Sequence, residues 1–568
     1  MPNRSTDIVF QLIRSLQKSE KRNFKLYIKR NSSNEDLKII ELFDAIDKLS
    51  DYDEVQLLKK LSSIKKQQLS NTKAHLYKQI LASLRLLKSS ESIDLQLHEQ
   101  LEYARILYNK GLYLQSLKIL EKTKELALQY NQDSFLIQVI SLEKKIETLH
   151  ITRSMQNRAE ILTNEATEVN ERRRMITGLS NLALKLYSWY VQNGHARDED
   201  DEKHIKKYFK DNLPPNANLQ TGFYDRLYLY QSYCWFAFIR QDFLMYYRYT
   251  QKWVNLFHDQ PQMVGVETSH YIKGMHNLMN AHFDLRNYQK LALTLKEFEK
   301  FAATDIATMH DNNRIQTFVY INSAKLNLQM SVGNFKEGLM LVPALEESLD
   351  EYSLYLDRHR ILVFNYKIAT LHFGAGNYET CVDYLRKIIN DHVDLRSDLQ
   401  CYARVLHLMA HYELGNTDII DHLIKSVYRF MAKMKNLTVI EEEMFKFLRK
   451  SFHVPRNSLK PLRSRSHDDT TLPLRLVHEQ NRLARLFAQK QTRDSTRKKA
   501  PAAASNTSLS LSLSLSLSLS LTQAAATASN NPHICNSCNT AHHIRRGRRV
   551  ACGYLRPAGV SITCVTCI

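Results

Sequence analysis

Four cysteines near the C-terminus have the spacing of a zinc site. Cys535 and Cys538 form one Cys-x2-Cys pair, and Cys564 and Cys567 form a second pair after 25 intervening residues. Two such pairs suit tetrahedral Zn²⁺, because thiolates at this spacing can converge on one metal ion. The alternative is that the cysteines lie together by chance in a tail of unusual composition. The sequence therefore offers a candidate zinc site, and it indicates no other cofactor.

Strict Ser-Leu alternation over residues 508–521 sets this tail apart from the rest of the chain. A repeated TC dinucleotide translates as Ser-Leu in any forward frame, which suggests that residues 463–568 are a frameshifted or misread extension. The alternative is a genuine low-complexity, disordered tail over residues 456–568. Resequencing the codons for residues 455–525 tests the hypothesis, and an intact frame in an independent isolate would contradict it.

The formal charge is also concentrated in the tail. The chain carries a net +20, of which residues 456–568 contribute +13 and residues 1–455 only +7. The charge of the whole chain is therefore poor evidence for nucleic-acid binding. No segment of residues 1–455 approaches the roughly 20 apolar residues of a membrane span. The first ten residues lack the apolar region of a secretory signal, so we expect a cytoplasmic protein with no membrane association.

The clearest basic patch outside the tail lies near the N-terminus, where Phe24 and Tyr27 are interleaved with cations. The patch consists of Lys18, Lys21, Arg22, Lys25 and Lys29. Such a patch can bind RNA, DNA or an acidic partner. A run of charge on a helix is more often a solvated face, and that is the interpretation we favour.

Signatures of catalysis are absent from the sequence. His407 and His411 are four residues apart on an expected helix, a spacing compatible with a metal ion, but no glutamate lies between them as in the metalloprotease pattern. The chain has no phosphate-binding loop, no dinucleotide-binding fingerprint and no G-x-S-x-G nucleophile motif. We expect a structural role for these histidines and no enzymatic activity.

Helix-breaking residues are scarce, which predicts an all-α fold. Between Asn3 and His453 the only prolines are Pro214, Pro215, Pro261 and Pro343. Residues 1–90 form a predicted N-terminal region of four helices, with Ser5 or Thr6, Asn34 and Asp53 at the starts of the first three. The acidic run at 198–202 and the paired prolines predict a loop break near 193–222.

A turn motif recurs over residues 91–455. A Gly or Asn is followed within two residues by an aromatic side chain that should open a second helix, as at Tyr113, Phe335 and Tyr378. Weaker copies stand at Phe243, Tyr288 and Thr417, so that from residue 243 onwards the motif recurs every 39–47 residues. This period predicts two-helix units. Such units stack, because a helix pair cannot bury its apolar face alone.

These positions resemble the tetratricopeptide-repeat family. The matching sets are Gly111, Tyr113 and Ser116; Gly333, Phe335 and Gly338; and Gly376, Tyr378 and Cys381. The period is longer than the roughly 34 residues of that family, and the usual closing proline is missing. The resemblance implies an α-solenoid that binds other proteins. Residues 16–25 also resemble the opening of uncharacterised helical-repeat proteins of Bacteroidetes-type bacteria, a similarity that implies no activity.

Thirteen aromatic residues crowd residues 223–253. One interpretation is core packing between helices. The other is a groove in which exposed aromatic side chains bind a peptide, and its candidate residues are Tyr228, Trp235, Tyr246, Tyr247 and Trp253. We therefore expect a helical-repeat scaffold that binds a protein or peptide. The alternative is a nucleic-acid-associated or regulatory protein that uses the N-terminal basic patch, although nucleic acid is the less favoured partner.

Overall fold

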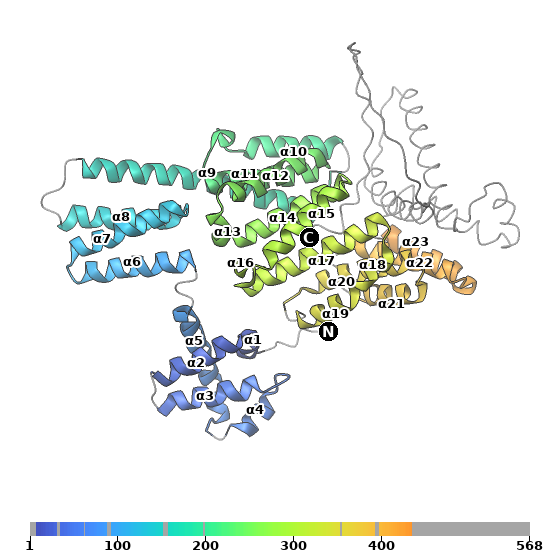
Figure 1. Ribbon diagram of the computed structural model, residues 1–568, viewed down its shortest axis with the longest axis horizontal. Helices are drawn as coiled ribbons and strands as arrows, with labels where there is room; N and C mark the ends of the chain where they lie inside the picture. The colour runs from blue at the N-terminus through green and yellow to red at the C-terminus, as the bar shows by residue number, and fades with distance from the viewer. Residues whose placement is uncertain are drawn as a thin grey trace, which may run out of the picture. The chain divides into compact units, whose positions relative to one another are not determined.

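The computed structural model describes residues 7–30, 34–61, 63–87, 92–150, 157–196, 199–352, 355–391 and 397–433. Every regular element in these ranges is a helix, which confirms the all-α prediction (Figure 1). The tail predicted from residue 456, with the four cysteines of the candidate zinc site, lies outside the described residues. The helices fall into two compact units, which divide between Arg173 and Arg174 and are described separately.

The N-terminal unit begins with a bundle of five helices and not four. They are α1 (Ile8–Ser15), α2 (Lys18–Arg30), α3 (Asn34–Asp47), α4 (Glu54–Lys60) and α5 (Lys66–Leu87). The side chain of Asp7, and not Ser5 or Thr6, caps α1 by accepting hydrogen bonds from the backbone N–H groups of Val9 and Phe10. Asp53 caps α4 as predicted.

A closed apolar core holds this bundle together. Helix α5 packs against α1, α2 and α3, which are distant from it in sequence. The most completely buried side chains include Phe24, Leu42 and Phe43. The rings of Phe24 and Phe43 lie 4.8 Å apart between centroids. The bundle therefore buries its apolar faces among its own helices.

Three further helices and the first part of a fourth complete the N-terminal unit. They are α6 (Ile93–Asn109), α7 (Tyr113–Gln129), α8 (Asp133–His150) and α9 (Arg158–Asn193), which continues into the second unit. Helix α7 packs against both α6 and α8. Ser116, the small residue of the first matching set, is buried. Its hydroxyl donates a hydrogen bond to the carbonyl oxygen of Ala104 at 2.8 Å. The small side chain thus lets α6 and α7 approach closely.

The second unit contains the remaining helices. They are α10 (Glu199–Asn212), the 3-10 turn η1 (Ala217–Leu219), α11 (Phe223–Ile239), α12 (Phe243–Asp259), α13 (Gln262–Val266), α14 (Thr268–Asp284), α15 (Tyr288–Ala302), α16 (Asp305–Thr308), α17 (Asp311–Val332), α18 (Phe335–Met340), α19 (Val342–Glu351), α20 (Arg358–Gly374), α21 (Tyr378–Ile389), α22 (Ser397–Glu413) and α23 (Thr417–Lys433). The predicted loop break is wrong for residues 199–212, which form α10. Its acidic residues occupy the first helical turn, where the helix dipole favours them.

Helices of the second unit pack mainly against their neighbours in sequence. Helix α14 contacts α12, α15 and α17, and α20 contacts α17, α18, α21 and α22 (Figure 1). Glycines allow close approach between successive pairs: a Cβ on Gly338 would lie 2.6 Å from a methyl group of Leu371. A Cβ on Gly374 would overlap the ring of Phe335.

The recurring turn has one backbone geometry. A residue within two positions of the end of each first helix takes a left-handed conformation, with φ of 76° at Gly111, 84° at Gly376 and 56° at Arg286. The next N–H then reaches back five residues, as from Asn377 to the carbonyl of His372 at 2.9 Å. This bond, and a second one donated by the N–H of the preceding residue, satisfy carbonyl oxygens that the end of the helix leaves without partners. Tyr113, Phe243, Tyr288, Phe335, Tyr378 and Thr417 are each the first residue of a second helix, as predicted.

Candidate protein-binding surfaces

We find no candidate metal site in the part of the chain that the structure describes. No group of three or more His, Cys, Asp or Glu side chains there could hold a metal ion. Cys234, Cys381 and Cys401 are buried. Burial raises the pKa of the Cys381 thiol to about 12, so it stays protonated. These three cysteines are core residues.

His407 and His411 are adjacent on α22, with ring centroids 4.5 Å apart. Burial, assisted by the charge of nearby arginines, lowers the pKa of His407 to about 4 and also lowers that of His411. The side-chain amide of Asn416 donates to Nδ1 of His411 at 2.9 Å. This bond links α22 to its closing turn, which supports the expected structural role.

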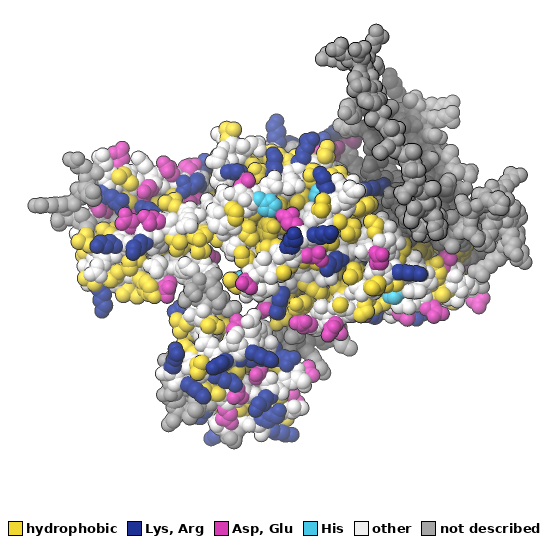
Figure 2. Space-filling model, in the orientation of Figure 1, with side chains coloured by type: hydrophobic (Ala, Val, Ile, Leu, Met, Phe, Trp, Pro, Cys, Tyr) yellow, Lys and Arg dark blue, Asp and Glu magenta, His cyan; other side chains and the backbone are white. Residues whose placement is uncertain are grey.

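The predicted N-terminal basic patch lies on α2 and is partly neutralised. Nζ of Lys21 lies 2.5 Å from a carboxylate oxygen of Asp47, and Nζ of Lys25 lies 2.6 Å from one of Asp44. Both acids belong to α3. The other three cations, Lys18, Arg22 and Lys29, are exposed. Figure 2 shows acidic side chains among the basic ones over this bundle. The patch is therefore a mixed charged surface.

The aromatic residues of 223–253 divide between core and surface. Phe223, Phe236, Phe238, Tyr246 and Trp253 are buried, and the other eight are half-buried. Tyr246 is 4% exposed and Trp253 is 3% exposed, so these two predicted partner contacts are core side chains instead. Trp253 packs against Gly274, where an added Cβ would lie 3.1 Å from its indole nitrogen. Core packing therefore explains part of this cluster.

Trp235 is half-buried on α11 and packs against α9. Its ring lies 5.0 Å from that of Tyr187 and 5.6 Å from that of Tyr190. Close by, Nδ1 of His195 donates to the carbonyl oxygen of Phe238 at 2.8 Å. Burial lowers the pKa of His195 to about 4, so the ring is neutral near pH 7. Trp235 presents only part of its surface to solvent.

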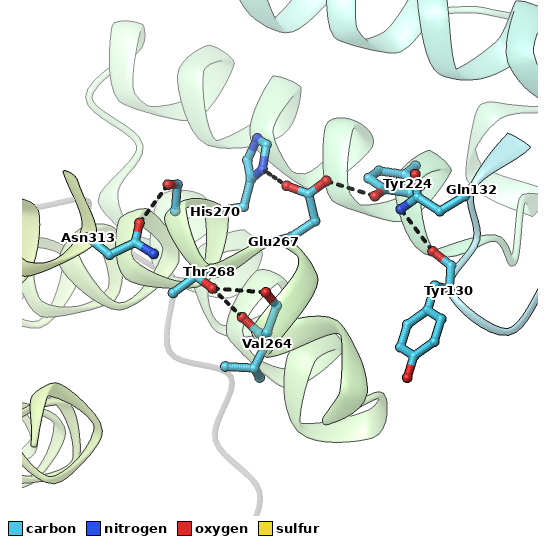
Figure 3. Close-up of polar contacts among 10 residues, drawn as sticks. Tyr130, Gln132, Tyr224, Val264, Glu267, Thr268, His270 and Asn313 are labelled. Carbon is cyan, nitrogen blue, oxygen red and sulfur yellow. Dashed lines mark hydrogen bonds and ion pairs between the residues drawn. The ribbon is translucent and has the colours of Figure 1, made fainter. Parts of the chain in front are cut away.

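A polar group made of Tyr224, Glu267 and His270 lies between the starts of α11 and α14 (Figure 3). The Glu267 carboxylate accepts hydrogen bonds from the Tyr224 hydroxyl and from Nδ1 of His270, each at 2.7 Å. Burial opposes ionisation of Glu267, but these bonds and the His270 charge outweigh it and hold its pKa below its usual range. Tyr228 lies with its ring 5.9 Å from that of His270, and burial raises its pKa. The group fixes α11 to α14 and leaves an aromatic edge in contact with solvent.

A second half-buried aromatic group joins α11 to α12. The rings of Tyr233 and Tyr249 are stacked, with centroids 4.2 Å apart and planes 10° apart. Nζ of Lys252 lies 4.9 Å from the centre of the Tyr249 ring and 5.9 Å from that of Tyr230. Burial, followed by the influence of Tyr233, raises the pKa of Tyr249 to about 12. Tyr249 is therefore neutral near pH 7 and partly covered by a cation.

Tyr247 points away from Tyr249 and contacts α14 and α15. Its ring is 5.2 Å from that of His282 and 5.7 Å from Nζ of Lys290. A hollow of about 600 Å³ runs beside α12, and Leu244, Tyr247, Arg248 and Lys252 are among the described residues that line it. Helix α12 thus lines this hollow with aromatic, aliphatic and cationic side chains.

Sequence reasoning missed Glu267, His270, Tyr224 and Lys290 as members of these surfaces. Tyr224 precedes Tyr228 by one helical turn, a spacing that could have marked them as neighbours. No local signal pairs Tyr224 with Glu267, because the two are 43 residues apart and meet only through packing of α11 against α14.

No protein-family model matches the chain, and no curated protein is significantly similar to it. Among the described helices, none is both long and apolar enough to cross a membrane.

Proposed function

We propose that the chain is a helical-repeat scaffold that binds a protein or peptide partner, with its two-helix units stacked as an α-solenoid like that of tetratricopeptide repeats. Two observations support the solenoid: helices contact their sequence neighbours, and the same left-handed turn joins the two helices of successive units. A stack of this kind presents a long surface made from many helices.

The observation that carries the binding proposal is the set of aromatic side chains left half-buried on α11 and α12. Eight of the thirteen aromatic residues in 223–253 keep partial contact with solvent, including the predicted contacts Tyr228, Trp235 and Tyr247. Tyrosine and tryptophan are enriched at energetically important positions of interfaces, because each combines a large apolar area with a polar atom.

Affinity capture with the full chain tests this proposal. A Tyr228→Ala and Tyr247→Ala double variant should lose partners that the unaltered protein retains, as judged by quantitative mass spectrometry. The matched control is Tyr103→Ala, which removes a tyrosine 44% exposed on α6. Circular dichroism checks that all three proteins are folded. If the double variant captures the same partners in the same amounts, the aromatic surface of α11 and α12 is not the binding surface.

A further inference from the structure

We propose that the outward face of α12, together with Lys290 of α15, docks an acidic peptide segment of the partner. This inference rests on the proposed scaffold function and specifies the chemistry of the partner. The face consists of Leu244, Tyr247, Arg248, Gln251 and Lys252, which helical spacing of three and four residues places on one side of α12.

The cations of this face have no acidic partners. Within the described part of the chain, Arg248, Lys252 and Lys290 form no ion pair, and all three are exposed. Lys252 and Lys290 instead lie over tyrosine rings. Asp242 is the carboxylate nearest to Arg248 in sequence, and it is engaged as the cap of α12, where it accepts from the N–H of Met245 at 3.0 Å. The face therefore has a net positive charge that a partner's carboxylates can neutralise.

An apolar anchor lies at one end of the same face. Leu244 is 53% exposed, one helical turn before Arg248, and Tyr247 is beside it. The hollow along α12 has room for several side chains of an extended or helical peptide. We assign Leu244 and Tyr247 to an apolar side chain of the peptide, and Arg248, Lys252 and Lys290 to its flanking carboxylates.

The tyrosine rings favour a peptide over a nucleic acid. Single-stranded nucleic acids bind by stacking bases on open aromatic faces. Tyr249 is already stacked on Tyr233 and lies beneath Lys252, while Lys290 lies over Tyr247. Because these ring faces are already in contact with a ring or a cation, they are poor platforms for base stacking, and the exposed cations beside them suit carboxylates.

The test is fluorescence anisotropy with the full chain and a fluorescein-labelled peptide in which glutamates flank two leucines. A matched peptide has glutamine at every glutamate position. We expect the glutamate peptide to bind at least tenfold more tightly at low salt, and its affinity to fall as salt is added. The variant Arg248→Glu, Lys252→Glu and Lys290→Glu should lose at least tenfold in affinity.

The control variant is Lys18→Glu, Arg22→Glu and Lys29→Glu, which makes the same change in net charge on the exposed side of α2. It should bind the glutamate peptide as the unaltered protein does. Equal binding of both peptides, or equal losses in both variants, would overturn the inference. So would tighter binding of a labelled single-stranded RNA that depends on the α12 cations, or light scattering that shows α12-dependent self-association.

Failure of this inference is distinguishable from failure of the scaffold proposal. If partner capture depends on Tyr228 and Tyr247 but not on the three cations, the scaffold stands and the acidic chemistry is wrong. If capture depends on neither set, the scaffold proposal itself fails.

Discussion

Helices α2 and α12 carry the same sequence pattern, cations interleaved with aromatic residues, yet they present different surfaces. On α2, Lys21 and Lys25 pair with carboxylates of α3. On α12, Arg248 and Lys252 form no ion pair with any carboxylate of the described residues, and Lys252 lies on tyrosine rings. The comparison shows that one sequence pattern can leave different charge on the surface, because the neighbouring helix decides how many of the cations are paired.

The surroundings of the two helices differ in the same way. The α1–α5 bundle closes on itself, because α5 contacts three helices distant in sequence. The helices from α11 onwards mostly contact the next helix or the next but one. A closed bundle brings many side chains together and neutralises them, whereas a succession of neighbours leaves one side of α12 exposed.

The largest expected effect tests whether the bundle is an independent core. Phe24→Ala removes a ring that is 1% exposed and should lower the free energy of unfolding of the bundle by about 3–5 kcal/mol. Hydrogen exchange should quicken in α1–α5 and stay unchanged in α20–α23. In contrast, Phe298→Ala, at an equally buried position of α15, should quicken exchange in its neighbours α14 and α17. Faster exchange in α20–α23 of the Phe24 variant would contradict independence.

Acid should affect the second unit selectively. The pKa of His195 is about 4 in the folded chain against an ordinary 6.5. As pH falls from about 6.5 to about 4, only the unfolded chain takes up this proton, so stability decreases by roughly 3 kcal/mol. Burial also lowers the pKa of His282 to about 4. In contrast, the only described histidine of the bundle, His75, is exposed.

Tryptophan fluorescence during urea denaturation measures this effect, because Trp189, Trp235 and Trp253 all belong to the second unit. The unfolding midpoint should fall between pH 6.5 and pH 4. A His195→Gln variant should show a shallower pH dependence, whatever its stability at pH 7. An unchanged slope in this variant would show that other groups control acid unfolding.

The smallest expected effect concerns the lysines themselves. Lys21→Gln breaks a half-buried ion pair and should lower the free energy of unfolding by about 0.5–1 kcal/mol. Lys252→Gln removes a lysine that makes no ion pair and should change it by no more than about 0.5 kcal/mol. Hydrogen exchange measures the local change in stability in α2–α3 for Lys21→Gln and in α11–α12 for Lys252→Gln. If the two variants lose the same free energy of unfolding, the ion pair of Lys21 does not distinguish α2 from α12 in stability.

The turns of the second unit were predictable from sequence, whereas the boundaries within the bundle were not. A Gly or Asn followed by an aromatic residue is a local signal, and the second helices begin at those aromatic residues. The break between α1 and α2 at Leu16 and Gln17 has no Gly or Pro to mark it. The acidic run before residue 203 resembles a loop in composition, yet it suits the first turn of α10.

The sequence predicted which segment carries the candidate surface, but not which of its aromatic side chains are in contact with solvent. Tyr246, Thr250, Trp253 and Phe257 form a buried stripe at helical spacing, which leaves Tyr247 on the outside. Because aromatic residues occur on several sides of α12, counting them does not separate the buried stripe from the partly exposed side chains. Contacts between distant helices, such as Lys290 with Tyr247, depend on packing that no local pattern specifies.

The main-chain turn that joins the helices of each pair also determines where the chain can vary in length. Its hydrogen bonds span a fixed number of residues, as from Asn287 back to His282, so one inserted residue would break them. The return connections follow no such rule: α13 fills the connection between α12 and α14, and α16 fills that between α15 and α17. Extra segments can therefore be accommodated at these return connections, while the register within each pair is preserved.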